Sequence, residues 1–236
     1  MRRSRRPFRR ALLDENKPTK RTQRSVATSE RILDAAEELF AHHGIYGVTM
    51  REIAELADVD TALLHYYFDS KRGVFDAVFA RRCDVLNSER MTELDRYEAQ
   101  AGGGLTVEGI IAAYLSPMFG LNRQGGKGWR NFCAFVTHLD STELADLFAK
   151  KFEPVLRRFI ALLQRALPDA DEADLFWSYH MFCGSLMIVN AANGSIENLS
   201  GGLCRTADFD AIEPRLVRYS AQGFRAICER KAARTQ

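Results

Sequence analysis

Residues 49–71 read TMREIAELADVDTALLHYYFDSK, and this stretch decides the fold. Thr49 and Glu52 have the spacing of a capping box, in which the threonine hydroxyl accepts from the Glu52 amide and the glutamate reaches back to the Thr49 amide. The apolar side chains that follow recur at helical spacing. The stretch therefore predicts two short helices, over residues 50–57 and 61–68, joined by a turn of about three residues.

The helices on either side of this stretch complete a compact unit. Before it, residues 29–43 carry apolar side chains on one face and end at Gly44, which suits a left-handed C-cap. After it, Ser70 can cap a long helix that begins at Lys71. Four helices joined by tight turns within about fifty residues leave the second and third crossing steeply, which is the helix-turn-helix arrangement.

The rest of the chain also repeats at helical spacing, and no stretch alternates polar and apolar residues as a strand would. We therefore expect an all-α protein with further helices over residues 105–121, 129–139, 141–167, 173–193 and 212–234. Pro117 should bend or end the first of these, Pro154 should break the third, and Pro214 should lie in the first turn of the last. Residues 195–208 are expected to form a loop.

Charge is unevenly distributed along the 236 residues. The formal net charge is only +2, from 33 basic and 31 acidic residues, and 46% of the residues are hydrophobic, as in an ordinary globular protein. Residues 1–24 contain ten basic and two acidic side chains, whereas residues 25–73 contain four basic and nine acidic ones. A near-neutral total therefore hides a basic arm with a charge of +8 and an acidic helix-turn-helix unit with a charge of −5.

The sequence disfavours secreted, membrane and disulfide-bonded proteins. The apolar run at residues 11–13 is too short for a secretory signal, and no segment is apolar over the roughly 18 residues that a membrane span needs. The five cysteines include no C-x-x-C pair, which favours buried reduced thiols over disulfides or zinc ligands. We therefore expect a cytoplasmic protein that needs no metal or other cofactor.

Residues 29–73 resemble the DNA-binding domain of TetR-family transcriptional regulators. The resemblance rests on a T-x-x-x-I-A motif at residues 49–54 and on a Y-F-x-S-K ending at residues 67–71. It implies that the helix over residues 61–68 is a recognition helix in the major groove of DNA, with phosphates gripped by Thr49 and Lys71. The full set of implied DNA contacts is Thr49, Thr61, Ala62, His65, Tyr66, Tyr67 and Lys71.

The aromatic side chains of the recognition helix have a structural alternative, because aromatic residues on helices usually pack inward. Three other apolar residues of this helix already supply a core face, so we expect at least two of His65, Tyr66 and Tyr67 to face DNA. Most family members carry tyrosine where this chain has His65. An imidazole can still donate to a phosphate or to a base edge.

This interpretation divides the chain into three parts: a disordered basic arm over residues 1–27, the DNA-binding domain over residues 28–73, and a ligand-binding and dimerisation domain over residues 74–236. The arm has two interpretations. Its cations supply the phosphate contacts that the acidic DNA-binding domain lacks, by following the backbone or the minor groove. Alternatively, the arm is only a solvated tail, as charge blocks often are. The sequence leaves both open.

The C-terminal part is rich in aromatic residues, with twelve of the fifteen phenylalanines and both tryptophans. At helical spacing most of these belong to a core. The family resemblance nevertheless implies a small hydrophobic effector in a pocket between the C-terminal helices, where helical proteins do form pockets. The side chains we expect to line this pocket are Tyr114, Met118, Trp129, Phe132, His138, Trp177, His180 and Met187. The two histidines have no carboxylate at a metal-ligand spacing, so they also fit a core or surface position.

A homodimer is implied by the last two long helices. Residues 175–192 are apolar on nearly every side, and such a helix must be covered all round. Small residues that allow two protomers to approach closely are Gly184, Ser185, Ala191, Ala192, Ala221 and Gly223. The family resemblance implies dimerisation through these helices, and a two-fold dimer presents two recognition helices to a palindromic operator.

The C-terminal part is also similar to a branch of the family that includes repressors released from DNA by long-chain fatty acids or their derivatives. The similarity lies in residues 158–168 (RFIALLQRALP), 182–186 (FCGSL) and 200–204 (SGGLC). It implies a fatty acid or acyl derivative as the effector, which suits a pocket of aromatic and aliphatic side chains.

These features predict a dimeric regulator without catalytic residues. It represses at a palindromic operator in double-stranded DNA until a small hydrophobic ligand releases it. One alternative is a DNA-binding regulator without an effector, in which every C-terminal aromatic side chain belongs to the core. A remote alternative is a helical enzyme, which is disfavoured because the sequence has no phosphate-binding glycine loop, nucleophile elbow or metal-ligand spacing.

Overall fold

The structure is a computed structural model that describes residues 20–124, 128–129, 131–133, 141–190 and 194–229. These residues form an all-α protein, as predicted, and contain no strand. In chain order the helices are α1 (Lys20–His43), α2 (Met50–Ala57), α3 (Thr61–Phe68), α4 (Lys71–Ala101), α5 (Val107–Gln124), α7 (Ser141–Ala166), α8 (Glu172–Asn190), α9 (Ser195–Leu199) and α10 (Phe209–Cys228).

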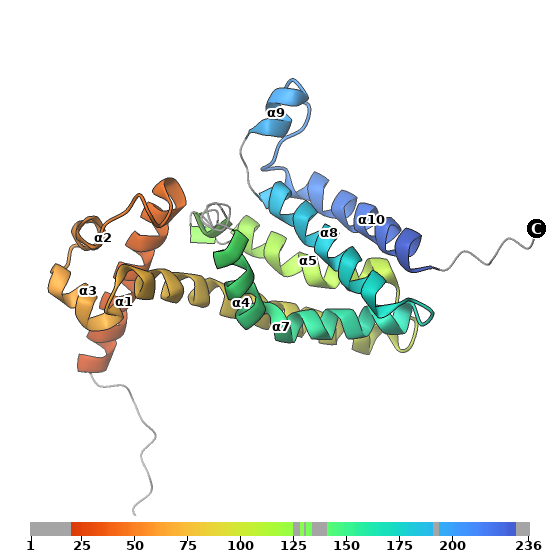
Figure 1. Cartoon of the computed structure of the whole chain (residues 1–236), viewed down its shortest axis with the longest axis horizontal. Helices are drawn as coiled ribbons and strands as arrows, with labels where there is room; N and C mark the ends of the chain where they lie inside the picture. Colours follow the sequence, from red (N-terminus) through yellow and green to blue (C-terminus); the bar gives the residue numbers. More distant parts are fainter. Residues whose placement is uncertain (1–19, 125–127, 130, 134–140, 191–193, 230–236) are drawn as a thin grey trace, which may run out of the picture.

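Two groups of helices are connected by the long helix α4 (Figure 1). At one end of the molecule, α1 and α3 pack on α4, and α2 packs on α1 and α3. The core there includes Phe40 and Phe75, whose rings meet edge to face with centroids 5.9 Å apart. Further along, α4 packs on α5 and α7, while α10 packs on α5 and α8. Because α4 belongs to both groups, it is the helix through which the two ends of the molecule are connected.

The predicted bounds of α2 and α3 and the predicted start of α4 are confirmed, and a side-chain cap fixes each start. Thr49 Oγ1 accepts from the Glu52 amide at 3.2 Å, and Glu52 Oε2 accepts from the Thr49 amide at 2.7 Å, which completes the capping box. The side chains of Asp60 and Ser70 accept from amides in the first turns of α3 and α4, at 2.7 and 3.1 Å. Since these amides have no partner within their own helices, the local sequence decides where each helix begins.

Helix α1 begins at Lys20 instead of residue 29. The prediction of a disordered arm is therefore wrong for residues 20–27, while residues 1–19 lie outside the described residues. No glycine or proline interrupts this first part of α1, and Ser25 anchors it through a hydrogen bond of 2.9 Å between its hydroxyl and that of Tyr67 in α3. The first residues of α1 are polar and show no apolar residues at helical spacing, so no pattern in the sequence indicated a helix there. The contact with α3 stabilises this part of the helix.

Proline does not end the C-terminal helices. Helix α5 continues through Pro117, and α7 continues through Pro154, where we predicted a break. Pro214 lies beyond the first turn of α10, because this helix begins earlier than predicted. A proline removes one backbone hydrogen bond, but burial of the neighbouring apolar side chains offsets that loss. In α7 these include Val155 and Phe159, which are 1% and 0% exposed.

The segment between α8 and α10 also differs from its prediction. It contains the short helix α9 where we expected a loop, and Figure 1 shows α9 projecting away from the other helices. Glu197 Oε1 accepts from the amide and the hydroxyl of Thr206, at 2.6 and 2.7 Å, and these bonds close the segment on itself. The last helix, α10, ends at Cys228, and residues 230–234 of its predicted range lie outside the described residues.

A buried ion-pair network joins α1 to α4. The Glu37 side chain is only 2% exposed and accepts from Arg81 Nη2 at 3.0 Å and from both Nε and Nη2 of Arg82 at 2.7 Å. At the solvent edge, Arg81 also pairs with Asp34 at 2.8 Å. The Arg82 guanidinium lies over the Trp129 ring, 5.1 Å from its centroid. The network therefore links α1 to an aromatic residue that follows α5.

All five cysteines are free thiols, and they differ in exposure. Cys83 and Cys228 are buried as predicted, whereas Cys204 is exposed because it lies in the projecting segment after α9. None of the helices in the described part of the chain combines the length and the apolar character that a membrane span requires. The same residues include no group of histidine, cysteine, aspartate and glutamate side chains that could hold a metal ion.

Candidate functional site

Helix α3 buries one face and presents the other to solvent. Leu64 is fully buried, whereas Ala62, His65 and Tyr66 are exposed, and Tyr66 retains 80% of its accessible surface. The turn before α3 contains Asp58 in the left-handed conformation, with φ of 52°. Capping at both the turn and the helix start fixes the angle at which α3 leaves α2. The exposed face of α3 is therefore held rigidly at one end of the molecule.

Three other predicted DNA contacts have partners within the chain. Lys71 Nζ donates to the Val48 carbonyl at 2.8 Å, the Tyr67 hydroxyl bonds to Ser25, and the Thr49 hydroxyl takes part in the capping box. These bonds hold the side chains in fixed positions. The Lys71 ammonium has three N–H groups, so the bond to Val48 uses only one of them.

The remaining predicted contacts on α3 also have defined positions. Thr61 is the first residue of the helix and is half-buried. His65 Nδ1 lies 2.9 Å from the carbonyl oxygen of Asp69, at the end of the same helix. When Nδ1 carries the proton and donates to this carbonyl, Nε2 is left as an acceptor.

Two exposed side chains in or beside α2 were not predicted as contacts. Arg51 lies in the first turn of α2 with 83% of its side chain exposed, and it pairs with Glu55 at 2.9 Å. Tyr46, in the turn before α2, is 79% exposed. Neither residue is among the seven contacts that the family resemblance implied. The helical period of α2, which buries Ile53, already placed Arg51 on the outer face.

The predicted effector residues do not share one environment. Trp177 and His180 are exposed on α8, where their rings meet edge to face with centroids 6.1 Å apart. Met187 is half-buried, and His138 lies outside the described residues. Four are buried, each at most 5% exposed: Tyr114, Met118, Trp129 and Phe132.

The four buried residues belong to separate parts of the interior. Trp129 and Phe132 meet edge to face at 5.9 Å, in the part of the structure that also contacts α4. Met118 Sδ accepts from the side-chain amide of Asn190 at 3.3 Å. Tyr114 belongs to what we call the aromatic cluster, in which neighbouring ring centroids lie 4.6–6.5 Å apart and whose members are Tyr114, Phe159, Tyr179, Phe182 and Phe224.

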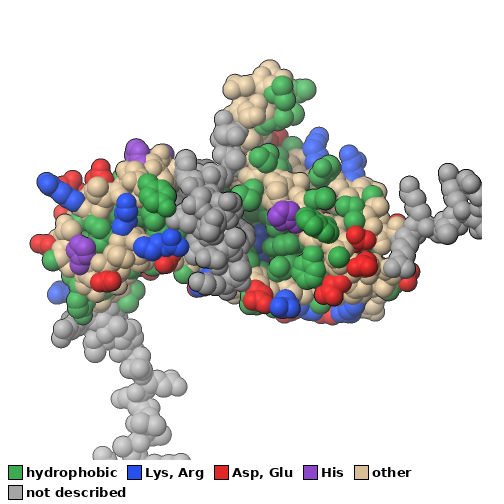
Figure 2. Space-filling model, in the orientation of Figure 1, with side chains coloured by type: hydrophobic (Ala, Val, Ile, Leu, Met, Phe, Trp, Pro, Cys, Tyr) green, Lys and Arg blue, Asp and Glu red, His purple; other side chains and the backbone are tan. Residues whose placement is uncertain are grey.

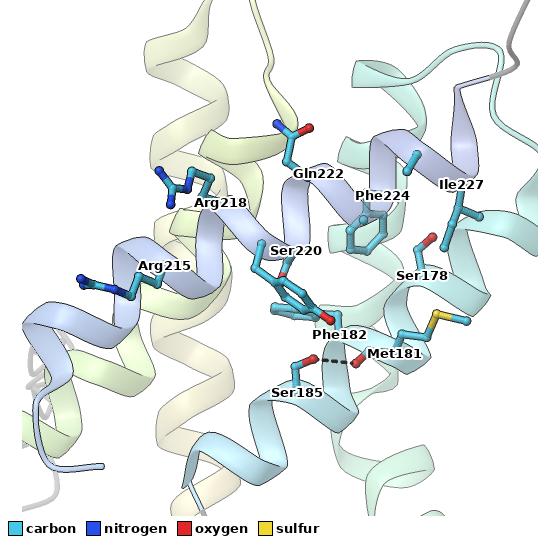
Figure 3. A pocket seen from close by; sticks show the side chains of 13 residues that line it. Ser178, Met181, Phe182, Ser185, Arg215, Arg218, Ser220, Gln222, Phe224 and Ile227 are labelled. Atoms are coloured by element: carbon cyan, nitrogen blue, oxygen red, sulfur yellow. Dashed lines mark hydrogen bonds between the residues drawn. The ribbon is translucent and has the colours of Figure 1, made fainter. Parts of the chain in front are cut away.

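An open groove with a volume of about 1030 Å³ lies between α8 and α10 (Figure 3). Its lining includes Phe182 and Phe224 of the aromatic cluster, so the groove wall continues into the interior. None of the predicted effector residues lines this groove. The other lining residues are Ser178, Met181, Ser185, Arg215, Arg218, Tyr219, Ser220, Gln222, Gly223, Ala226 and Ile227.

The outer face of α8 is strongly apolar, and Figure 2 shows hydrophobic side chains gathered over this part of the molecule. Within the single chain, α8 buries only Leu175, Ser178 and Phe182. The prediction that this helix must be covered all round is therefore not met by one chain alone. The apolar side chains left 44–74% exposed are Phe176, Trp177, Met181 and Ile188.

Two family models match this chain, one over the helix-turn-helix unit and one over the C-terminal helices. Residues 32–78 match the family of bacterial regulatory proteins named tetR, and residues 112–223 match the tetracyclin repressor-like C-terminal domain. Over 66 residues the chain is 38% identical to the HTH-type transcriptional regulator RutR of Escherichia coli K12. That match covers 28% of this chain and 31% of RutR, so it spans about a third of the relative.

Solved structures share the fold over most of the chain. The fatty acid degradation regulator FadR from Bacillus halodurans aligns with a TM-score of 0.57 and 19% identity, covering 84% of this chain and 96% of that one. The hemolysin II transcriptional regulator HlyIIR aligns with a TM-score of 0.55 and 16% identity, covering 83% and 97%. At such low sequence identity, these alignments show that the fold is shared and nothing about function. With both matched domains in place on one all-α chain, the protein belongs to the TetR family of helix-turn-helix transcriptional regulators.

Proposed function

We propose that the protein is a homodimeric, ligand-responsive repressor that binds a palindromic operator. The observation that carries this proposal is the exposed face of α3, with Ala62, His65 and Tyr66, which capped ends hold in place. A rigid helix with polar and aromatic side chains facing outward fits the major groove of DNA. In this proposal Thr49 and Lys71 bind backbone phosphates at the two ends of the helix-turn-helix unit.

Two further residues of α3 and one of α2 complete the proposed DNA interface. Thr61, at the start of α3, and Tyr67, beside α1, contact the backbone next to the bases that α3 reads. Arg51 adds a cation on the exposed side of α2. Its ion pair with Glu55 is exposed and therefore weak, so a phosphate can replace the carboxylate.

Dimerisation through α8 and α10 would cover the apolar outer face of α8. Contiguous exposed apolar surface on a globular protein marks an interaction site. Gly184 on α8 and Gly223 on α10 leave open space where a Cβ atom would stand, so another pair of helices can approach closely. We therefore place the two-fold axis beside these helices, with one recognition helix at each end of the dimer.

The boundary between the DNA-binding domain (residues 28–73) and the effector and dimerisation domain (residues 74–236) falls within α4 in this proposal. An effector acts to the extent that it binds two conformations with different affinity. The contacts from Trp129 through Arg82 to Glu37 give a direct route by which a change beside α5 shifts α4 against α1.

We propose a small hydrophobic effector of the fatty acyl class. The five neighbouring rings of the aromatic cluster support this class, and the structural relative FadR is named for fatty acid degradation. A regulator without an effector is the second candidate. It is favoured by the close packing of Tyr114 on Phe159, whose ring centroids are 4.6 Å apart.

Dodecanoate is a suitable probe for the effector. At a hundred times its dissociation constant, a ligand that binds only the folded chain adds about 2.7 kcal/mol to the free energy of unfolding. We expect dodecanoate to raise the melting temperature and to release a duplex that the protein binds. Stabilisation without release would contradict the switch, and absence of both would favour the regulator without an effector.

We also propose that the N-terminal arm contacts DNA. Residues 1–19 contain seven basic and two acidic side chains, and removing them leaves α1 intact from its first residue. Each phosphate contact contributes about 0.9 to the slope of log affinity against log salt concentration. The truncated chain should therefore show a shallower slope in anisotropy titrations between low and moderate salt. An unchanged slope would mean that the arm is a solvated tail.

A further inference from the structure

Arg90 is a buried cation in the middle of α4. Only 3% of the accessible surface of Arg90 is exposed. Nε donates to the Tyr114 carbonyl at 3.1 Å, and the guanidinium carbon lies 4.0 Å from the centroid of the Tyr114 ring and 5.8 Å from that of Phe152. These contacts place the charged group against the aromatic cluster, between α4 and α5.

No carboxylate faces this cation within the part of the chain that the structure describes. Other arginines of α4 and α7 are paired: Arg81 and Arg82 with Glu37, and Arg158 with Asp95. For Arg90, by contrast, no ion pair is found among the described residues. A cation removed from water without an opposite charge is costly, so the lack of one calls for an explanation.

The polar groups around Arg90 are neutral. Burial raises the pKa of the Tyr114 hydroxyl, and it also raises the pKa of the Cys83, Cys133 and Cys183 thiols. All four groups therefore keep their protons at neutral pH. None of them supplies the negative charge that a buried guanidinium favours.

The contacts that Arg90 makes within the chain use little of its capacity to donate hydrogen bonds. Nε satisfies one helix carbonyl, and the rings of Tyr114 and Phe152 cover the guanidinium face. A guanidinium has five N–H donors in a planar fork that matches a carboxylate, and the one hydrogen bond found here uses only one of them. The other four remain available to a ligand.

We propose that Arg90 binds the carboxylate of an amphipathic effector whose hydrocarbon chain lies among the rings of the aromatic cluster. This inference rests on the proposed function and narrows the effector to a free acid. Phe182 and Phe224 belong to both the cluster and the groove in Figure 3, so the cluster extends as far as the wall that α8 and α10 form. A neutral ester of the same acid lacks the charge that Arg90 recognises.

The test compares dodecanoate with methyl dodecanoate on the full-length chain. The wild type should bind the acid roughly 10- to 100-fold more tightly than the ester, because hydrogen bonds to charged groups discriminate by that amount. Arg90→Met should lose this preference by weakening the acid alone. Arg90→Lys, which keeps the charge, should recover part of it. Equal binding of acid and ester by the wild type, no binding of the acid, or unchanged acid binding by Arg90→Met would overturn the inference.

Thermal stability without ligand gives a second, independent readout. Arg90→Met removes an unpaired buried charge and should melt at the same temperature as the wild type or higher. Arg82→Met, which leaves the buried Glu37 with one cation fewer, should melt lower and serves as the matched control. A lower melting temperature for Arg90→Met would assign Arg90 to the scaffold instead.

Operator binding separates this inference from the proposed function. If the wild type binds dodecanoate through Arg90 but remains bound to DNA, the carboxylate site is supported and the proposed release from DNA by the effector is contradicted. If operator binding is retained while no acid binds, the inference fails and a DNA-binding regulator remains.

Discussion

Replacing Glu37 with alanine should lower the free energy of unfolding by about 3 kcal/mol. Glu37 is the carboxylate shared by Arg81 and Arg82, and it is only 2% exposed. Its removal leaves Arg82 without the partner that holds both Nε and Nη2. Because the network joins α1 to α4, the change should also loosen the attachment of the helix-turn-helix unit. Urea denaturation followed by circular dichroism measures the effect.

Asp34→Asn is the matched control for this prediction. Asp34 also pairs with Arg81, but 67% of its side chain is exposed. Exposed ion pairs contribute at most about 1 kcal/mol, so this variant should be nearly as stable as the wild type. Equal stabilities of the Glu37 and Asp34 variants would show that the buried network does not hold α1 on α4.

Gly223→Arg should convert the proposed dimer to a monomer and weaken operator binding by about two orders of magnitude or more. The reason is that Gly223 lines the groove between α8 and α10, where an arginine would occupy the space proposed for the partner. Within one chain, a Cβ atom at this position meets nothing within 4 Å. Two linked half-sites gain about 10²–10⁴ in avidity over one, and a monomer loses that gain. Analytical ultracentrifugation and anisotropy titration measure the two effects.

Ala99→Arg serves as the control for this change. It places the same side chain on an exposed position of α4 that is outside the groove, and it should leave both dimer and operator affinity unchanged. The Gly223 variant should itself fold normally, since arginine is a better helix former than glycine by up to about 1 kcal/mol. A dimeric Gly223→Arg protein would contradict the placement of the two-fold axis.

Local sequence predicted the helix-turn-helix unit most closely. The bounds of α2 and α3 depend on caps within three residues of each helix start, and Thr49 and Asp60 show these caps directly in the sequence. The start of α1 depends instead on Ser25 reaching Tyr67, which is 42 positions away. Continuation of α7 through Pro154 likewise depends on burial of its neighbours. Such non-local contacts leave no short-range pattern.

The candidate site was predictable only in part. The family resemblance implied contacts by Tyr66 and His65, which the structure exposes, but it gave no sign that Lys71 bonds to the Val48 carbonyl. The role we propose for Arg90 was missed, although a signal was present. Leu86, Arg90 and Leu94 follow one another at intervals of four, which places a charged residue on the apolar face of α4. An isolated cation in an apolar stripe is a reason to look for an anionic ligand.

Recovery of bound duplexes from a random pool of double-stranded DNA, using the full-length chain, tests the central claim most directly. We expect the recovered sequences to share an inverted repeat and to bind at least about 10³-fold more tightly than a scrambled duplex of the same length. Replacing His65 and Tyr66 together by alanine should bring the affinity down to that of the scrambled duplex. No common sequence among the recovered duplexes, or equal affinity of wild type and variant for them, would contradict a DNA-binding regulator that reads its operator with α3.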